Sequence, residues 1–187
     1  MAFNASASPA DALDLRRAFG RFGTGVTVIT TRTPAGQRLG VTANSFNTVS
    51  LAPPIVLWSL AAGSPSLAGF RAAGRFVVNV LALEQLELAQ RFARPAPAQA
   101  ADKFAGVDSR EGLHGQPVLA GCAASIECRI VGDQHVGDHV LFLGEVERYD
   151  HAGVTPLLFC SGQFQQGVNL RPAPADLVYR SASKGNP

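Results

Sequence analysis

The chain has 187 residues, of which 47% are hydrophobic and 16% charged, and its formal net charge is +2. This length fits one domain with its own core, and so small a charge does not favour nucleic acid or an anionic membrane as a partner. No run approaches eighteen apolar residues, so no transmembrane helix is expected. A secretory signal is absent and the cysteines are odd in number, which predicts reduced thiols and a cytoplasmic protein.

The first elements can be predicted from periodicity and turn residues. Residues 1–8 are small and polar and are expected to be flexible, before a domain over 9–169 and a tail over 170–187. After Ser8-Pro9, the residues Leu15, Phe19 and Phe22 mark one face of a helix. Strands are then predicted over three ranges, with a turn at 33–36 between the first two: 26–32, 39–44 and 55–60.

Two helices and another strand are predicted next. Ser64-Pro65-Ser66 has the cap-then-proline signature of a helix start, and this helix is expected to end at Gly74. A strand follows over 76–81 and a helix over 84–92, with Leu86 and Ala89, or Leu88 and Phe92, pointing inward. The Pro/Ala-rich stretch 94–101 reads as a loop that is able to move.

The second half of the chain is dominated by strands. Residues 105–116 are expected to be irregular, and long strands are predicted over 122–131 and 139–149, joined through 132–133 and 135–138. Short strands over 157–160 and 163–168 would close the fold. Many strands and few helices predict a mainly β protein, an antiparallel β-barrel with peripheral helices, and no βαβ nucleotide site.

The segment from Gly40 to Pro54 is the most informative about function. It places short hydroxyl and amide side chains among the apolar residues Val41, Ala43 and Phe46. Such a segment can lie flat against a large polar heterocycle and offer it backbone groups and neutral hydrogen bonds. It can equally be a Ser/Thr-rich edge strand and turn, and composition alone does not decide between the two.

Common catalytic motifs are missing from the sequence. There is no Gly-x-Ser-x-Gly elbow, no His-Glu-x-x-His and no P-loop lysine, and Cys160 has no His or Asp motif beside it. The cysteines and histidines are not spaced as zinc ligands, so no metal site is predicted. A reaction carried by an organic cofactor is therefore favoured.

Four segments resemble one known family in the right order: 22–31, 40–60, 74–81 and Gly137-Asp138-His139 with the strand that follows. They resemble the flavin reductases with an FMN-binding split-barrel fold, the reductase components of two-component flavin-dependent monooxygenases. The resemblance implies a Greek-key-like antiparallel barrel. It also implies an NAD(P)H:flavin oxidoreductase that reduces FMN or FAD and supplies reduced flavin to a partner monooxygenase.

The same resemblance implies which residues bind the cofactors. The flavin-contacting positions are Thr42, Ala43, Asn44, Ser45, Ser59, Leu60, Ser64 and Ser66, with Lys103 and Phe104 as a second region. His139 matches the histidine that contacts the nicotinamide of NADH or NADPH. No catalytic side chain is implied, because the hydride passes directly between nicotinamide and flavin. Simple N-capping is the alternative role for Ser64, and Trp58 is expected in the core.

Several choices stay open from the sequence. A flavin-binding electron carrier of the same fold, or a split barrel with another cofactor, are the alternatives to the reductase. The low charge content favours a homodimer. Nothing ranks the arginines that could select NADPH over NADH, and nothing separates FMN from FAD.

Overall fold

The computed structural model describes residues 9–94, 102–168 and 170. The helices within them are α1 (Pro9–Phe19), α2 (Leu67–Ala73) and α3 (Leu86–Ala93), the last preceded by a 3₁₀ turn (Leu83–Gln85). The strands are β1 (Thr24–Gly25), β2 (Thr27–Arg32), β3 (Arg38–Ala43), β4 (Asn47–Leu51), β5 (Pro54–Ala61), β6 (Arg75–Val80), β7 (Ser109–Glu111), β8 (Pro117–Leu119), β9 (Ala124–Val136), β10 (His139–His151), β11 (Leu157–Cys160) and β12 (Gln163–Gln166). The predicted tail and the loop at 95–101 lie outside this range, apart from Leu170.

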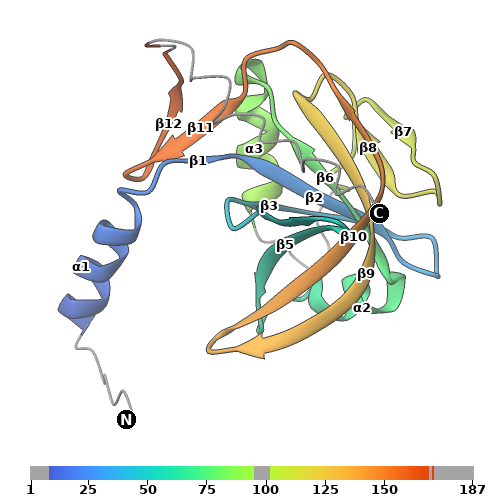
Figure 1. Ribbon diagram of the computed structural model, residues 1–187, viewed down its shortest axis with the longest axis horizontal. Coiled ribbons are helices and arrows are strands. Elements are labelled where there is room, and N and C mark those ends of the chain that lie inside the picture. The colour runs from blue at the N-terminus through green and yellow to red at the C-terminus, as the bar shows by residue number, and fades with distance from the viewer. Residues whose placement is uncertain (1–8, 95–101, 169, 171–187) are drawn as a thin grey trace, which may run out of the picture.

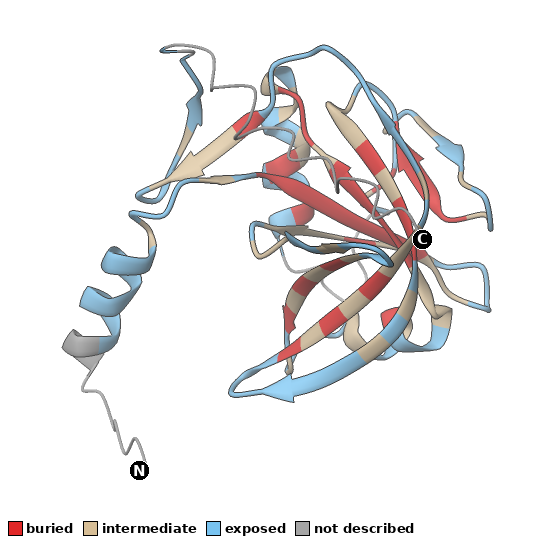
Figure 2. Ribbon diagram, in the orientation of Figure 1, coloured by how far each residue is buried: buried red, intermediate tan, exposed pale blue. Residues whose placement is uncertain are grey.

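Seven strands form one antiparallel sheet in the order β3-β2-β6-β9-β10-β5-β4. β2 pairs with β6, and β5 with β10, so neighbours in the sheet are distant in the chain, as in Greek-key connections. The sheet curls around a core that Figure 2 shows along its inner side. Two smaller sheets, β1-β11-β12 and β7-β8, lie beside it. The predicted antiparallel barrel with peripheral helices is confirmed.

The core is aromatic and follows the alternation of β5 and β10. Trp58 is fully buried and stacks on Phe142 with ring centroids 5.0 Å apart, while Phe70 of α2 meets its edge, also at 5.0 Å. In β5 the buried residues Val56, Trp58 and Leu60 alternate with more accessible ones. The core position expected for Trp58 is confirmed.

The barrel has a seam where the sheet curls back on itself. Residues of the edge strand β3 lie against β5, although the two strands are not hydrogen-bonded neighbours. Just after β3, the hydroxyl of Ser45 donates to the carbonyl oxygen of Ser59 at 3.1 Å and accepts from its N–H at 2.9 Å. This side chain therefore fastens the two sides of the seam.

Three predicted boundaries are wrong. The stretch expected to be irregular contains β7 and is followed at once by its partner β8, and strands of three residues are too short to show an alternation. β9 runs on to Val136, so the joint with β10 is only Gly137-Asp138, with Gly137 at a φ of 59°. A separate strand, β4, occupies the end of the Ser/Thr-rich segment and pairs with β5.

The helices show two further differences. Ser64 is not the cap of α2: the N-cap is Ser66, its side chain makes no capping bond, and its N–H donates to the Ser64 hydroxyl at 3.3 Å. In α3, Ala89 and Phe92 are buried while Leu86 is 36% exposed, so the inward pair combines one residue from each predicted pair.

Helix α1 stands away from the barrel (Figure 1). The helix is present as predicted, but the residues expected on its apolar face are exposed: Leu15 by 48%, Phe19 by 69% and Phe22 by 75%. Within the described part of the chain, no helix is long and apolar enough to cross a membrane.

Candidate functional site

A cleft of about 890 Å³ opens at the barrel seam. Its floor is β3, from Arg38 to Thr42, and one wall is formed by the end of β5 with the start of α2. The opposite wall is formed by the end of α3 and by residues 102–104. The volume falls within the usual range of a small-molecule or cofactor site.

The cleft brings together six of the predicted site residues, from four segments of the chain: Thr42, Leu60, Ser64, Ser66, Lys103 and Phe104. Ala43, Asn44, Ser45 and Ser59 do not line it but continue from its floor along the seam. His139 lies outside it as well, although it is paired in register with Ala61, which does line the cleft.

Two glycines determine how closely the cleft's parts approach. A Cβ on Gly40 would come within 2.5 Å of the Phe92 ring, and one on Gly69 within 2.2 Å of Leu39 Cδ1. Both distances are far shorter than van der Waals contact, so a larger residue at either position would displace the side chains that form the floor and walls.

The floor is joined to α3 by two hydrogen-bonded side chains. Thr42 donates its hydroxyl to the Ala89 carbonyl oxygen at 2.7 Å. Lys103 donates its ammonium to the carbonyl oxygens of Phe92, at 3.1 Å, and Gly40, at 3.5 Å. Burial lowers the pKa of Lys103, because a partly dry environment disfavours the charged form. The ammonium nevertheless sits where carbonyl dipoles of the α3 C-terminus favour a cation.

Arg38 lies at the end of the β3 floor opposite to Thr42. Arg38 forms an ion pair with Asp102 through Nη2, and its guanidinium lies 4.8 Å from the centre of the Phe104 ring. The N–H of Phe104 donates to Asp102 Oδ1 at 3.0 Å. This bond, helped by Arg38, lowers the pKa of Asp102, so the carboxylate is ionised at neutral pH.

The serines at the start of α2 give the cleft neutral donors. Ser64 and Ser66 both line it and are half-buried. α2 has only seven residues, and its first turn contains no acidic residue. The hydroxyls and the cations across the cleft, rather than a long helix dipole, are therefore what an anionic group would meet here.

His139 is the first residue of β10 and follows the hairpin turn. Its Nδ1 lies 2.7 Å from Asp138 Oδ1, and its side chain is 47% exposed. The hydrogen bond to His139 lowers the pKa of Asp138. The Asp138 carbonyl oxygen accepts from the N–H of Ala62, at 2.9 Å, which ties the turn to the end of β5 beside the cleft.

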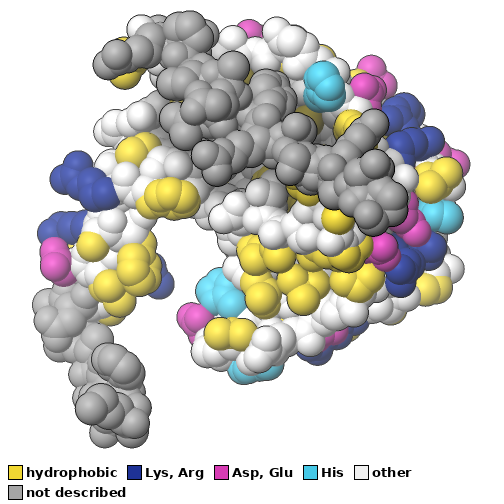
Figure 3. Space-filling model, in the orientation of Figure 1, with side chains coloured by type: hydrophobic (Ala, Val, Ile, Leu, Met, Phe, Trp, Pro, Cys, Tyr) yellow, Lys and Arg dark blue, Asp and Glu magenta, His cyan; other side chains and the backbone are white. Residues whose placement is uncertain are grey.

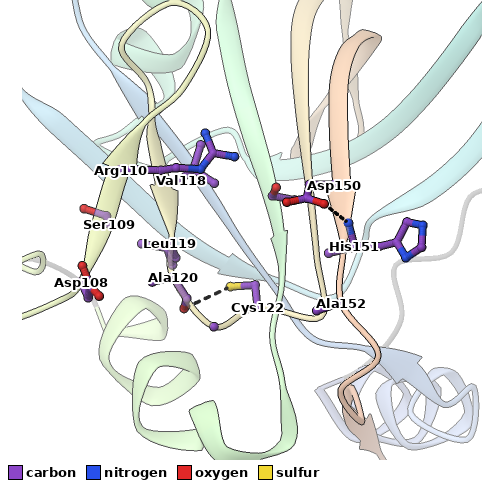
Figure 4. Close-up of a pocket in the computed structure, with 13 residues that line it drawn as sticks. Asp108, Ser109, Arg110, Val118, Leu119, Ala120, Cys122, Asp150, His151 and Ala152 are labelled. Carbon is purple, nitrogen blue, oxygen red and sulfur yellow. Dashed lines mark hydrogen bonds between the residues drawn. The ribbon is translucent and has the colours of Figure 1, made fainter.

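A second cavity, of about 470 Å³, lies between the β7–β8 ribbon and the ends of β9 and β10 (Figure 4). It contains none of the predicted site residues. Burial raises the pKa of the Cys122 thiol, which lines this cavity, to about 11, so the thiol stays protonated at neutral pH. The neighbouring Asp150 carboxylate accepts the backbone N–H of His151 at 2.9 Å. Nothing in this arrangement activates a nucleophile.

The donor set of the seam cleft fits a phosphorylated aromatic cofactor. Apolar side chains such as Leu60 and Phe104 stand beside neutral hydroxyls, and arginine and lysine cations lie within the same cleft. Among the described residues, no group of three or more metal-ligating side chains is found. Arg38 and Asp102 were missed from the sequence, because a pair 64 residues apart leaves no local signal.

Comparisons with known proteins agree on one family. The model of the flavin reductase like domain matches residues 19–167. A probable flavin reductase of Rhizobium meliloti is 42% identical over 150 residues, covering 80% of this chain and 47% of that protein. The FMN reductase (NADH) SmoA of Agrobacterium fabrum is 42% identical over 149 residues, covering 80% of this chain and 82% of that protein.

The solved structures agree with the sequence comparisons. The NADH:FAD oxidoreductase SgcE6 of Streptomyces globisporus superposes with a TM-score of 0.80 at 38% identity, covering 87% of this chain and 97% of that one. The chain spans about half the length of the first relative, the Rhizobium meliloti protein.

Proposed function

The chain belongs to the flavin reductase-like family, and from that premise we propose that it is an NAD(P)H:flavin oxidoreductase that reduces FMN or FAD. The observation that carries the proposal is the seam cleft, where six residues implied by the family resemblance line one cavity. The relatives named as an FMN reductase (NADH) and an NADH:FAD oxidoreductase support the same chemistry. When bound, the flavin accepts the hydride that the nicotinamide gives up.

The residues of the seam divide the work of holding a flavin. The backbone from Thr42 to Ser45 offers hydrogen-bonding groups to the ring system, and Ser45 keeps that backbone in place through Ser59. Ser64 and Ser66 offer hydroxyls to the phosphate, with Lys103 across the cleft. Because Lys103 is bonded to two carbonyl groups, its main contribution is a fixed positive charge.

The open cleft favours a flavin that exchanges over one that is permanently held. The groups offered to the phosphate at Ser64 and Ser66 are neutral hydroxyls. They lie away from the flavin ring, so they should bind oxidised and reduced flavin with similar affinity. Reduced flavin would then leave for a partner monooxygenase, as the names of several relatives suggest for those proteins. The alternative, an electron carrier, requires flavin to remain bound.

The assay that tests the proposal is NADH oxidation by purified protein, followed by loss of NADH absorbance with and without added FMN or FAD. Turnover that saturates with added flavin is expected. Protein that stays yellow after dialysis, and does not oxidise NADH faster when flavin is added, would instead support the carrier.

Replacing His139 with alanine is expected to raise the KM for NADH about tenfold, the usual worth of one hydrogen bond to a charged or polar ligand. The dissociation constant for oxidised flavin should change less than twofold, because His139 lies outside the cleft. Steady-state kinetics and flavin titration measure the two quantities.

His135→Ala is the matched control. His135 is exposed on the adjacent strand and paired in register with Val140, one residue from His139. If the two variants have the same KM for NADH, the nicotinamide role of His139 is wrong.

A homodimer is part of the proposal. The apolar side of α1 is exposed, and on the outer side of the sheet Leu57 is paired with Leu143, both only half-buried. Figure 3 shows hydrophobic side chains on α1 and in a patch on the barrel, with a hollow between them. A second copy related by a twofold axis would cover both surfaces at once.

Sedimentation equilibrium at micromolar concentration is expected to give the mass of two chains. The double variant Phe19→Ser with Phe22→Ser should shift the protein toward monomer while its far-ultraviolet circular dichroism stays native. A monomeric wild-type protein would rule out the dimer. The cytoplasmic location stays a prediction.

A further inference from the structure

The end of the seam cleft farthest from the Thr42–Ser45 segment contains a prearranged arginine. Arg38 begins β3, which forms the cleft floor, and its side chain is 32% exposed. The ion pair with Asp102 holds one edge of the guanidinium, and the Phe104 ring supports its face at 4.8 Å. An arginine held flat in this way loses little conformational freedom when it binds a ligand.

Strand β3 also measures how far Arg38 lies from the proposed ring-binding segment. A strand advances about 3.3 Å per residue, so the four steps from Thr42 back to Arg38 span about 13 Å. The cleft is continuous over this distance, because every residue from Arg38 to Thr42 lines it. With the ring system at Thr42–Ser45 and the first phosphate at Ser64 and Ser66, as proposed above, Arg38 is left for the part of the ligand that follows that phosphate.

Four cations line the cleft, Arg32, Arg38, Arg94 and Lys103, and the hydrogen bonds of three of them can be compared. Lys103 is engaged with the carbonyl groups of Phe92 and Gly40. Arg32 donates to the Gly115 carbonyl oxygen at 2.7 Å and to Glu111 at 3.1 Å. Arg38 is bonded within the described residues through Nη2 alone, while a guanidinium has five N–H donors.

We propose that Arg38 is a specificity-determining residue that binds the diphosphate of FAD, so that the chain prefers FAD to FMN. This inference rests on the proposed function, since it assumes that the flavin ring system lies along Thr42–Ser45. The AMP half of the dinucleotide then occupies the Arg38 end of the cleft. A guanidinium suits this task because it pairs with two phosphate oxygens in one plane.

Asp102 and Phe104 are the positioning residues for Arg38. The carboxylate is fixed by the Phe104 N–H and faces one edge of the guanidinium, so the other edge is directed away from it. An exposed ion pair of this kind contributes little to stability. Its value lies in orienting Arg38 before the ligand arrives.

The test is isothermal titration calorimetry, in which purified wild-type protein and variants are titrated with oxidised FAD and with oxidised FMN. Wild-type protein is expected to bind FAD at least about tenfold more tightly than FMN, the usual worth of a hydrogen bond between charged groups. Arg38→Ala should weaken FAD binding about 10- to 100-fold and change FMN binding less than threefold. Arg38→Lys, which keeps the charge but not the planar fork, should fall between the two.

Arg71→Ala is the matched control. It removes the same charge and breaks another exposed Arg–Asp pair, with Asp133, but Arg71 does not line the cleft. Its two dissociation constants should equal those of the wild type. Thermal unfolding followed by circular dichroism verifies that each variant is folded.

The outcomes separate this inference from the proposed function. Equal affinity of the wild-type protein for FAD and FMN, or an equal loss of both in Arg38→Ala, would overturn the role of Arg38 and leave the reductase intact. Failure of folded wild-type protein to bind either flavin would overturn the proposed function and the inference together.

Discussion

Glu127→Ala is expected to lower the free energy of unfolding by about 3 kcal/mol, the range for breaking a largely buried, hydrogen-bonded ion pair. The Glu127 side chain is only 6% exposed, and its Oε1 accepts from Arg148 Nε at 2.7 Å. Its Oε2 accepts the N–H of Leu113 at 2.5 Å. Removing the carboxylate leaves this N–H and the arginine without their partner. Urea unfolding followed by circular dichroism measures the loss.

Glu145→Ala provides the comparison for Glu127. Glu145 also pairs with an arginine, Arg129, but its side chain is 33% exposed. A more exposed pair contributes about 0–1 kcal/mol, so this variant should unfold close to the wild-type midpoint. Equal losses in the two variants would show that burial of Glu127 has no special role.

Asn79→Ala should be at least as damaging, with an expected loss of about 3 kcal/mol from unsatisfied hydrogen bonds and a small cavity. The Asn79 side chain is fully buried. Its amide donates to the Val28 carbonyl oxygen at 2.9 Å and to Thr30 Oγ1 at 3.0 Å, and its oxygen accepts the N–H of Leu119 at 2.9 Å. None of these groups can reach water in place of the lost partner.

The matched variant is Asn47→Ala on the exposed strand β4. The Asn47 side chain accepts only the adjacent N–H of Thr48, at 2.8 Å, where water can replace it. Its effect on the unfolding midpoint should be small. Both Asn79→Ala and Glu127→Ala should keep the wild-type affinity for flavin at temperatures where they are folded, because neither residue lines the seam cleft. A specific loss of flavin binding by folded protein would contradict the placement of the site.

These two buried polar residues explain why the β7–β8 ribbon lies where it does. Asn79 holds β8 through Leu119, and Glu127 holds the connection between β7 and β8 through Leu113. The hydroxyl of Thr30 adds a third attachment by donating to the Pro117 carbonyl oxygen, at 2.5 Å. The ribbon is therefore fixed by side chains of the main sheet as much as by its own two short strands.

Local patterns were sufficient for the longer elements. β5 was predicted because a run of apolar residues follows the Pro-Pro stop at 53–54, and the structure places Trp58 at the centre of the core. The hairpin β2–β3 was predicted from β-branched residues around a Thr-Pro-Ala-Gly turn. In each case the decisive information lies within about ten residues, which is the range over which periodicity and turn chemistry act.

The lining of the candidate site was predicted only in part, because some of its contacts form only in the folded chain. Thr42, Leu60, Ser64, Ser66, Lys103 and Phe104 were implied by the family resemblance, and the structure brings them to one cleft. The role of Ser45 in joining the seam could not be predicted, because Ser59 becomes its partner only after the sheet has curled.

The sequence by itself determined the antiparallel β class, the longer strands and the residues that resemble a flavin site, since these depend on neighbours along the chain. Tertiary structure alone decided the closure of the seam, the exposure of α1 and the meeting of Arg38 with Asp102 and Phe104. The seam and the Arg38 contacts join residues far apart in the chain. They arise from the way a twisted sheet buries its aromatic side, and no local pattern records them.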